Sequence, residues 1–192
     1  MRIIRQSDFT PAPWKNGGGV TREAIRVPAN GDPFRWRVSV AHIERSGPFS
    51  DFAAYQRIMV LLKGGGAALK FANGDERLLL NVGDLAQFDG ALPAQCELQS
   101  GPCVDLNLMA AKSLQGVDTW VRRLNEPLEL PAVRGRATLV FAIDAPLKLQ
   151  AGADDAASLE PWDLAVIADS DGAATVAAAA AAALVFVATL PR

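Results

Sequence analysis

The sequence predicts an all-β protein made of many short strands, arranged as a sandwich or a barrel with little helix. Residues 34–43 (FRWRVSVAHI) alternate between apolar and polar side chains, and this period of two indicates a strand. Asn73-Gly74 lies between two apolar segments, which is the strongest short-range signal for a β-hairpin. Short apolar segments bounded by turn residues recur along the rest of the chain.

Further strands are predicted throughout the first half, where turn residues separate short apolar segments. These segments are RIMVLL (57–62), AALKF (67–71), ERLLL (76–80), LAQF (85–88), QCEL (95–98) and VDLNLM (104–109). The second half shows the same pattern more weakly. Its predicted strands are TLVFAI (138–143), LKLQ (147–150), LAVIA (164–168) and LVFVATL (184–190).

Two segments of the second half are harder to interpret. Residues 114–124 (LQGVDTWVRRL) are the clearest helical candidate. The alanine run 177–183 has a high intrinsic helix propensity, but β-branched residues flank it, so we expect a strand there. A change of composition near residues 112–116 predicts an N-terminal barrel of residues 1–112 and a smaller C-terminal half of residues 113–192, packed as one compact unit.

Composition excludes several classes of partner. With 19 basic and 21 acidic residues the formal net charge is −2, so no basic surface is offered to a nucleic acid. The alanine-rich run 173–190 is less apolar than a membrane anchor, so no membrane partner is expected. The first residues, MRIIRQSDF, lack the apolar core of a signal peptide. Together with two thiols predicted to be structural, Cys96 and Cys103, this favours a cytoplasmic protein.

The segment 13–23 (PWKNGGGVTRE) combines three glycines with charged and polar side chains. Glycines let the backbone approach another group closely, and successive N–H groups in such a loop can form an anion-binding nest. We expect the segment to contribute to a pocket for a carboxylate ligand, through Lys15, Asn16, Gly18, Thr21 and Arg22. The alternative is a glycine-rich bulge whose cations pair with local acids such as Glu23 or Asp105.

The strand candidate DLNLM (105–109) has one apolar face and one polar face. Asp105 and Asn107 share the polar face, which either meets solvent or points into the mouth of a barrel. In the second case both side chains need partners, because burying them unpaired is costly. Arg57, Arg37 and Arg22 are the candidate partners.

Several motifs in order resemble one family over about residues 3–124. They are PWKNGGGVTRE (13–23), WRVSVA (36–41), GPFSDF (47–52), Arg57 at the start of RIMVLLKGGG, FDG (88–90) and DLNLM (105–109). The chain thereby resembles the HutD/Ves family. The resemblance implies a cupin-like double β-barrel of the RmlC-like jelly-roll type, often in a homodimer. It also implies a link to histidine-utilisation genes, with a regulatory role suspected and no family-wide catalytic activity.

The chain departs from this pattern at Gln56, where the family usually has an acidic residue before the arginine. The loss of that acid leaves Arg57 with less internal neutralisation and therefore more available to an anion. Many cupins hold a metal with two or three histidines, the first two spaced H-x-H. This chain has one histidine, His42, so we expect neither a metal site nor another cofactor.

The leading hypothesis is a non-catalytic cytoplasmic binder of a small carboxylate metabolite, linked through the resemblance to the regulation of histidine utilisation. One alternative is a metal-independent enzyme, an isomerase or hydrolase, with Asp105 or Glu23 as the base. Another is a dimeric interaction module without a ligand. No catalytic residues are assigned, and the predicted ligand-binding residues are Lys15, Asn16, Gly18, Thr21, Arg22, Arg57, Asp105 and Asn107.

Overall fold

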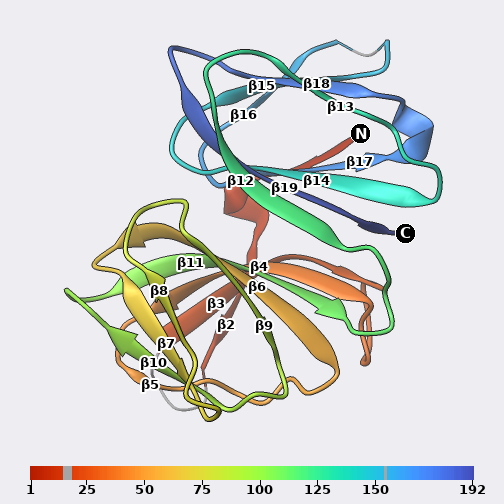
Figure 1. Ribbon diagram of the computed structural model, residues 1–192. Helices are drawn as coiled ribbons and strands as arrows, with labels where there is room; N and C mark the ends of the chain where they lie inside the picture. Colours follow the sequence, from red (N-terminus) through yellow and green to blue (C-terminus); the bar gives the residue numbers. More distant parts are fainter. Residues whose placement is uncertain (15–18, 154) are drawn as a thin grey trace. The chain divides into compact units, whose positions relative to one another are not determined.

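The chain forms two compact units in the computed structural model, which describes residues 1–14, 19–153 and 155–192. The N-terminal unit consists of Phe9–Ser113, and the C-terminal unit consists of Met1–Asp8 together with Leu114–Arg192. Both units are built from antiparallel strands (Figure 1). The only helical segments among the described residues are two short 3-10 turns, η1 (Gln6–Asp8) and η2 (Asp169–Asp171). The prediction of an all-β protein with little helix is confirmed.

The N-terminal unit is a barrel of two antiparallel sheets that face each other (Figure 1). The six-stranded sheet contains, in spatial order, β2 (Thr10–Pro13), β3 (Gly19–Val27), β4 (Trp36–Ile43), β11 (Cys103–Ala111), β6 (Tyr55–Gly64) and β9 (Leu85–Asp89). The four-stranded sheet contains β5 (Gly47–Pro48), β10 (Ala94–Leu98), β7 (Ala67–Phe71) and β8 (Glu76–Leu79). The predicted Asn73-Gly74 turn lies between β7 and β8, which pair as a hairpin.

Alternation along the central strands gives the six-stranded sheet two different faces. On β4, Trp36, Val38 and Val40 share one face, and the positions between them share the other. The inner face meets the four-stranded sheet in an apolar core that includes Met59, Leu61 and Leu69. The sequence of β4 and β11 therefore dictates which side chains point into the barrel, because successive residues of a strand point to opposite faces.

The C-terminal unit is a second barrel of two antiparallel sheets. Its five-stranded sheet contains, in spatial order, β1 (Arg2–Ile4), β17 (Leu164–Ala168), β14 (Arg136–Ala142), β19 (Ala183–Pro191) and β12 (Asp118–Leu124). Its four-stranded sheet contains β13 (Leu128–Leu130), β18 (Ala174–Ala178), β15 (Leu147–Ala151) and β16 (Ala157–Leu159). Aliphatic side chains from both sheets fill the space between them, among them Leu149, Val176 and Val185.

The first residues belong to the C-terminal unit, contrary to the predicted N-terminal barrel of residues 1–112. β1 pairs with β17, and Asp163 accepts hydrogen bonds from the Arg5 side chain and the Gln6 backbone. A three-residue strand carries no local signal for its distant partner, because pairing depends on the free sheet edge that the fold offers. The other boundary, between Ser113 and Leu114, lies close to the predicted one.

Two local predictions in the second half are corrected by the structure. The predicted helix over residues 114–124 is wrong, because β12 occupies Asp118–Leu124 and pairs with β19 along its whole length. The alanine run 177–183 is not one strand. It contains the end of β18, a bend at 179–181 and the start of β19. In β12 and at the two ends of the alanine run, sheet pairing overrides the intrinsic helix propensity.

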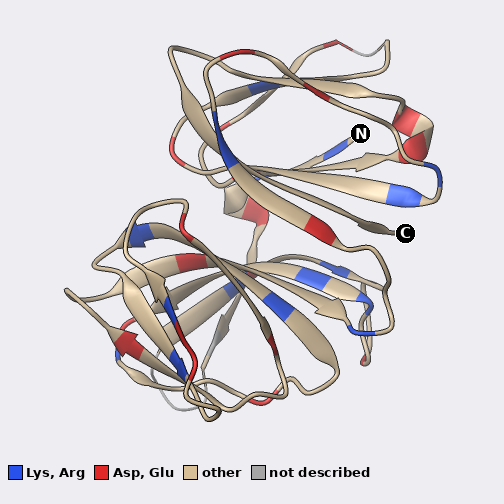
Figure 2. Cartoon of the chain, viewed as in Figure 1, with Lys and Arg blue, Asp and Glu red and all other residues tan. Residues whose placement is uncertain are grey.

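Cys96 and Cys103 are buried free thiols in the apolar core of the N-terminal barrel. Burial raises the pKa of each thiol to about 12, so neither is a nucleophile near neutral pH. None of the helical segments in the described part of the chain is long and apolar enough to cross a membrane. Basic and acidic residues are interspersed over the strands of each unit (Figure 2).

Candidate functional site

The N-terminal barrel encloses a cavity of about 600 Å³. Its wall is formed by the inner faces of β3, β4, β6 and β11 and by the loop that follows β5. Apolar rings line part of it, and the charged or polar side chains in its wall include Thr21, Glu23, Arg37, Arg57, Asp105 and Asn107. This size and this mixture of apolar wall and few polar groups are typical of a small-molecule site.

Arg57 is the most isolated charge in the cavity wall. It lies on β6 opposite Met109 of β11, and only 5% of its surface is exposed. Its guanidinium carbon lies 4.7, 5.1 and 5.6 Å from the ring centres of Phe49, Phe88 and Phe52. No hydrogen-bond partner for its Nε is found among the described residues. Burial lowers the pKa of Arg57 to about 10, so the side chain is still cationic at neutral pH.

Asp105 and Asn107 are neighbours on the inner face of β11, with exposed fractions of 2% and 5%. Asn107 Nδ2 donates a long hydrogen bond of 3.4 Å to Asp105 Oδ2. The Oδ1 atoms of both side chains have no partner in the described part of the chain. Burial raises the pKa of Asp105 to about 7, although the positive charge of Arg57 acts in the opposite direction.

Arg37 and Glu23 form a second charged group in the wall. Arg37 Nε lies 4.0 Å from Glu23 Oε2, and an Arg37 terminal nitrogen lies 3.3 Å from the Met109 sulfur. Burial lowers the pKa of Arg37, while the charge of Glu23 counteracts this effect. Glu23 also accepts a hydrogen bond of 3.2 Å from Arg26. Arg37 therefore has a carboxylate at ion-pair distance, whereas Arg57 has none among the described residues and only the nearby charge of Asp105 acts on it.

The structure brings Thr21, Arg57, Asp105 and Asn107 together around the cavity, as the sequence analysis expected. Thr21 Oγ1 accepts a hydrogen bond of 2.7 Å from the Trp14 indole. Lys15, Asn16 and Gly18 lie outside the described residues. Because Asp105 and Asn107 line the cavity, the polar face of β11 points into the barrel and not into solvent.

The prediction that Arg22 lines the pocket is wrong. Arg22 lies opposite Val40 on β4, so its side chain is on the face of the sheet that looks away from the cavity. The same alternation places Trp36 on that face and Trp14 in the cavity wall. Two adjacent residues of one strand cannot both point inward, and Thr21 occupies the inward position.

The sequence does not predict the phenylalanine rings that surround Arg57, although it offers Trp14 as an apolar part of the pocket wall. Phe49 and Phe52 belong to the GPFSDF motif, and Phe88 precedes Asp89-Gly90, but no local pattern shows that their rings surround one arginine. The sequence predicts Arg37 only as a partner for Asp105 and Asn107. The signal that could place Arg37 in the wall is its spacing of two residues from Ser39, because both side chains then lie on the inner face of β4.

The residues of this cavity do not fit the metal that many cupins hold. Its carboxylates, Glu23 and Asp105, share the wall with two guanidinium groups, and His42 lies opposite Val20 and Val104 on the other face of the sheet. Among the residues that the structure describes, no three His, Cys, Asp or Glu side chains gather as a metal site would require.

A cavity of about 460 Å³ in the C-terminal unit differs in its polar groups. Arg136 donates hydrogen bonds to the carbonyl groups of Gly116 and Thr189, and Glu129 accepts one from Thr175. Because these charged groups have partners within the protein, they are less available to a ligand than Arg57 and Asp105. The N-terminal cavity is therefore the better candidate site.

The arrangement in the N-terminal cavity suits an anion of small size. Arg57 supplies a buried cation without an ion-pair partner among the described residues, and the same part of the chain leaves polar atoms of Asn107 and Asp105 without partners. Hydrogen bonds to charged groups are strong in a site that excludes water. The phenylalanine rings offer an apolar surface for the remainder of a ligand.

Comparison with known proteins places this geometry in context. The family model HutD matches residues 6–186. A sequence relative, described as an uncharacterized 21.2 kDa protein in the hutC 3' region of Pseudomonas putida, is 43% identical over 112 residues, which cover 58% of each chain. Protein Ves of Escherichia fergusonii is 33% identical over 97 residues, 50% of each chain. The match thus spans little more than half the length of these relatives.

Solved structures match over the whole chain. HutD from Pseudomonas fluorescens SBW25, in a formate condition, is 27% identical with a TM-score of 0.82, covering 100% of this chain and 98% of that one. An oxalate decarboxylase of Lactobacillus farciminis, in a formate complex, is 9% identical with a TM-score of 0.71, covering 99% and 86%. At that identity the second likeness concerns the fold alone, and it shows the cupin-like double barrel.

Proposed function

Because the chain belongs to the HutD family, whose model matches residues 6–186, we propose that it is a non-catalytic binder of a small carboxylate metabolite. The ligand occupies the cavity of the N-terminal barrel, and its carboxylate binds Arg57. The protein acts in the cytoplasm, where binding reports on or buffers the level of the acid.

The observation that carries this proposal is the state of Arg57. A buried guanidinium group loses several kcal/mol of hydration, and a protein normally compensates with a carboxylate or with hydrogen bonds. Here three aromatic rings and the charge of Asp105 compensate in part, and Nε has no hydrogen-bond partner among the described residues. A ligand carboxylate would supply the missing partner. Gln56, in place of the family's acid, agrees with a site that leaves this charge for a ligand.

The link to histidine utilisation rests on the relatives. The Pseudomonas putida relative is described by its place in the hutC 3' region, and a structural neighbour is named HutD. The structure of that neighbour is described as a formate condition, which agrees with a site for a carboxylate. Acids from histidine breakdown are therefore the first ligands to examine.

A second candidate function is favoured by one observation. The pKa of Asp105 is raised to about 7, and a carboxyl group that titrates near neutral pH inside a cavity can act as a general acid or base. This would suit a metal-independent isomerase or hydrolase that holds its acid substrate through Arg57. The interaction-module alternative gains no such support, because the cavity contains polar groups without partners in the described part of the chain.

A thermal-shift screen tests the proposal directly. Urocanate, formylglutamate, glutamate and formate are each compared with sodium chloride at equal ionic strength. An acid present at 100 times its Kd should add about 2.7 kcal/mol of apparent stability. Glutamine serves as the uncharged counterpart of glutamate and should give a smaller shift.

Two further measurements separate the candidate functions. NMR spectra of each stabilising acid, recorded over a day with the protein, should show no product if the protein is only a binder. Steady conversion that Asp105→Asn abolishes would favour the enzyme instead. If none of the four acids changes the melting temperature of the protein, the binding proposal is contradicted.

A further inference from the structure

We propose that Asp105 binds the ligand as a carboxylic acid: its O–H donates a hydrogen bond to the ligand carboxylate, and binding takes up a proton from solvent. This inference rests on the proposed carboxylate-binding function and specifies how the same site distinguishes its ligand. The proton moves from water to Asp105, and no bond of the ligand is made or broken.

The geometry of Asp105 leaves one oxygen for this role. Asp105 lies between Ala41 on β4 and Leu61 on β6, so both flanking side chains are apolar. Oδ2 accepts the hydrogen bond from Asn107, whereas Oδ1 is buried without a partner in the described part of the chain. Both oxygen atoms belong to the Asp105 side chain, which is part of the cavity wall. A buried oxygen of this kind is costly unless it is protonated and donates, or accepts from a ligand.

The surrounding charges decide between these two states. The charged and titratable groups that face Asp105 come from several strands: Arg57 on β6, Arg37 on β4, Glu23 on β3, Cys96 on β10 and Cys103 on β11. Both thiols are neutral because burial raises their pKa to about 12. Arg57 is the principal group that favours the ionised form, and burial outweighs it, so the pKa of Asp105 is about 7.

Charge balance in the cavity then favours proton uptake. Arg37 is partly neutralised by Glu23, at 4.0 Å. If Asp105 is ionised, it balances Arg57, and a ligand carboxylate would add an uncompensated negative charge. If Asp105 is protonated, the ligand carboxylate itself balances Arg57. Two carboxylates in one buried site share a proton, because the second charge raises the pKa of its neighbour.

The experiment measures formate binding by isothermal titration calorimetry from pH 6 to about pH 9 at constant ionic strength. Formate is ionised throughout this range, so only the protein titrates. Titrations at about pH 8 in phosphate and in Tris, which differ in ionisation enthalpy, give the number of protons taken up. The wild-type Kd should be constant below pH 7 and should rise about tenfold for each pH unit above it. Close to one proton should be taken up at the higher pH.

Two variants make the result specific. Asp105→Asn keeps an N–H donor but cannot titrate, so its Kd for formate should stay flat with pH. Arg57→Met should weaken formate binding at every pH. A wild-type Kd that is flat above pH 7, with no proton uptake, would overturn the role of Asp105 and leave carboxylate binding intact. Absence of formate binding at all pH values would overturn this inference and count against the proposed function, and the four-acid screen would then decide the latter separately.

Discussion

Replacing Arg57 by methionine should weaken ligand binding without lowering the stability of the fold, because burying the charged guanidinium group of the wild type costs free energy. Burial lowers the pKa of Arg57 from 12.5 to about 10, which corresponds to roughly 3 kcal/mol against the charged form in the folded state. The contacts with Phe49, Phe52 and Phe88 offset about 0.5–1 kcal/mol per ring. Methionine keeps an apolar stem of similar length.

The expected free energy of unfolding of Arg57→Met is therefore equal to that of the wild type or up to about 1 kcal/mol higher. Carboxylate affinity should fall roughly 10- to 150-fold, the equivalent of a charge-assisted hydrogen bond of about 1.5–3 kcal/mol. Urea denaturation gives the first quantity and calorimetry with the best acid of the screen gives the second. Both are measured at about pH 6, where Asp105 is protonated and its state does not change with the substitution.

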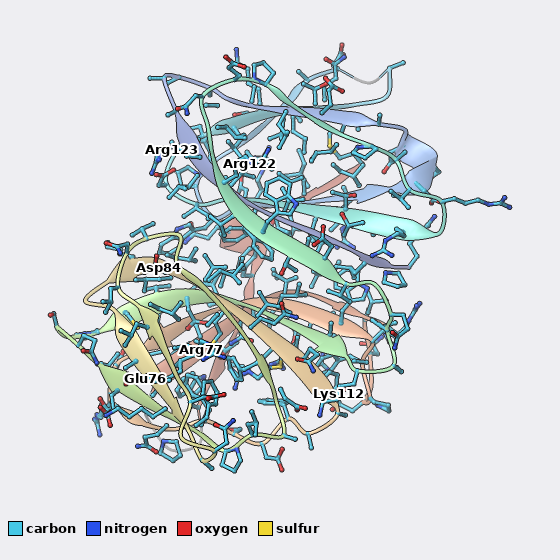
Figure 3. The ribbon with its side chains drawn as sticks, viewed as in Figure 1. Glu76, Arg77, Asp84, Lys112, Arg122 and Arg123 are labelled. Carbon is cyan, nitrogen blue, oxygen red and sulfur yellow. The ribbon has the colours of Figure 1, made fainter. Side chains whose placement is uncertain are left out.

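Arg77→Met is the matched control. Arg77 lies on β8 at the edge of the four-stranded sheet and is exposed (Figure 3). Among the described residues its side chain donates a hydrogen bond to the backbone carbonyl group of Glu76. Its removal should change stability by less than about 0.5 kcal/mol and leave acid binding unaltered. If Arg57→Met loses more than about 2 kcal/mol of stability while the control does not, Arg57 is a structural group and the argument from its unpaired charge is refuted.

Three other outcomes are expected. The pKa of Asp105 is raised from 3.8 to about 7, so the protonated side chain stabilises the folded state fully below pH 3.8, and this stabilisation is lost as the pH rises through 7. The difference in free energy of unfolding between the wild type and Asp105→Asn should therefore decline from pH 3.8 to 7. A difference that stays constant with pH would contradict the raised pKa. Gly19→Ala should cost about 1–3 kcal/mol, because its Cβ would lie 2.2 Å from the His42 carbonyl oxygen, whereas Gly47→Ala, with nothing within 4 Å, should be nearly neutral in the same melts. Asp163→Ala should cost about 2–4 kcal/mol and expose the first residues to limited proteolysis, since this buried carboxylate accepts hydrogen bonds from that segment; an unchanged digestion pattern would show that the segment is held in another way.

Local patterns of the sequence determined the fold class. The alternation of apolar and polar side chains in residues 36–40 and 104–108 places the two kinds on opposite faces of a strand, which is a property of each segment by itself. The Asn73-Gly74 turn is equally local, because its backbone conformation needs only the two residues in it. The same alternation indicated that Asp105 and Asn107 share one face.

The alternation also excludes one of the predicted pocket residues. Thr21 and Arg22 are adjacent on one strand, so at most one of them could line the pocket. Both faces of β4 are buried, one against apolar side chains and the other around the cavity. The sequence pattern of the strand does not distinguish these two surroundings, because both bury the side chain.

Only the tertiary structure decided which segments meet. The register of β11 against β6 places Asp105 opposite Leu61 and Met109 opposite Arg57, and this register shifts between Val104 and Asp105. β12 is a strand because β19 offers it an edge, although its own residues favour a helix. Pairings between residues far apart in sequence depend on the edges and cavities that the whole chain creates, and no single segment encodes them. The raised pKa of Asp105 also depends on the tertiary structure, because the strands that bury this side chain come from several parts of the sequence.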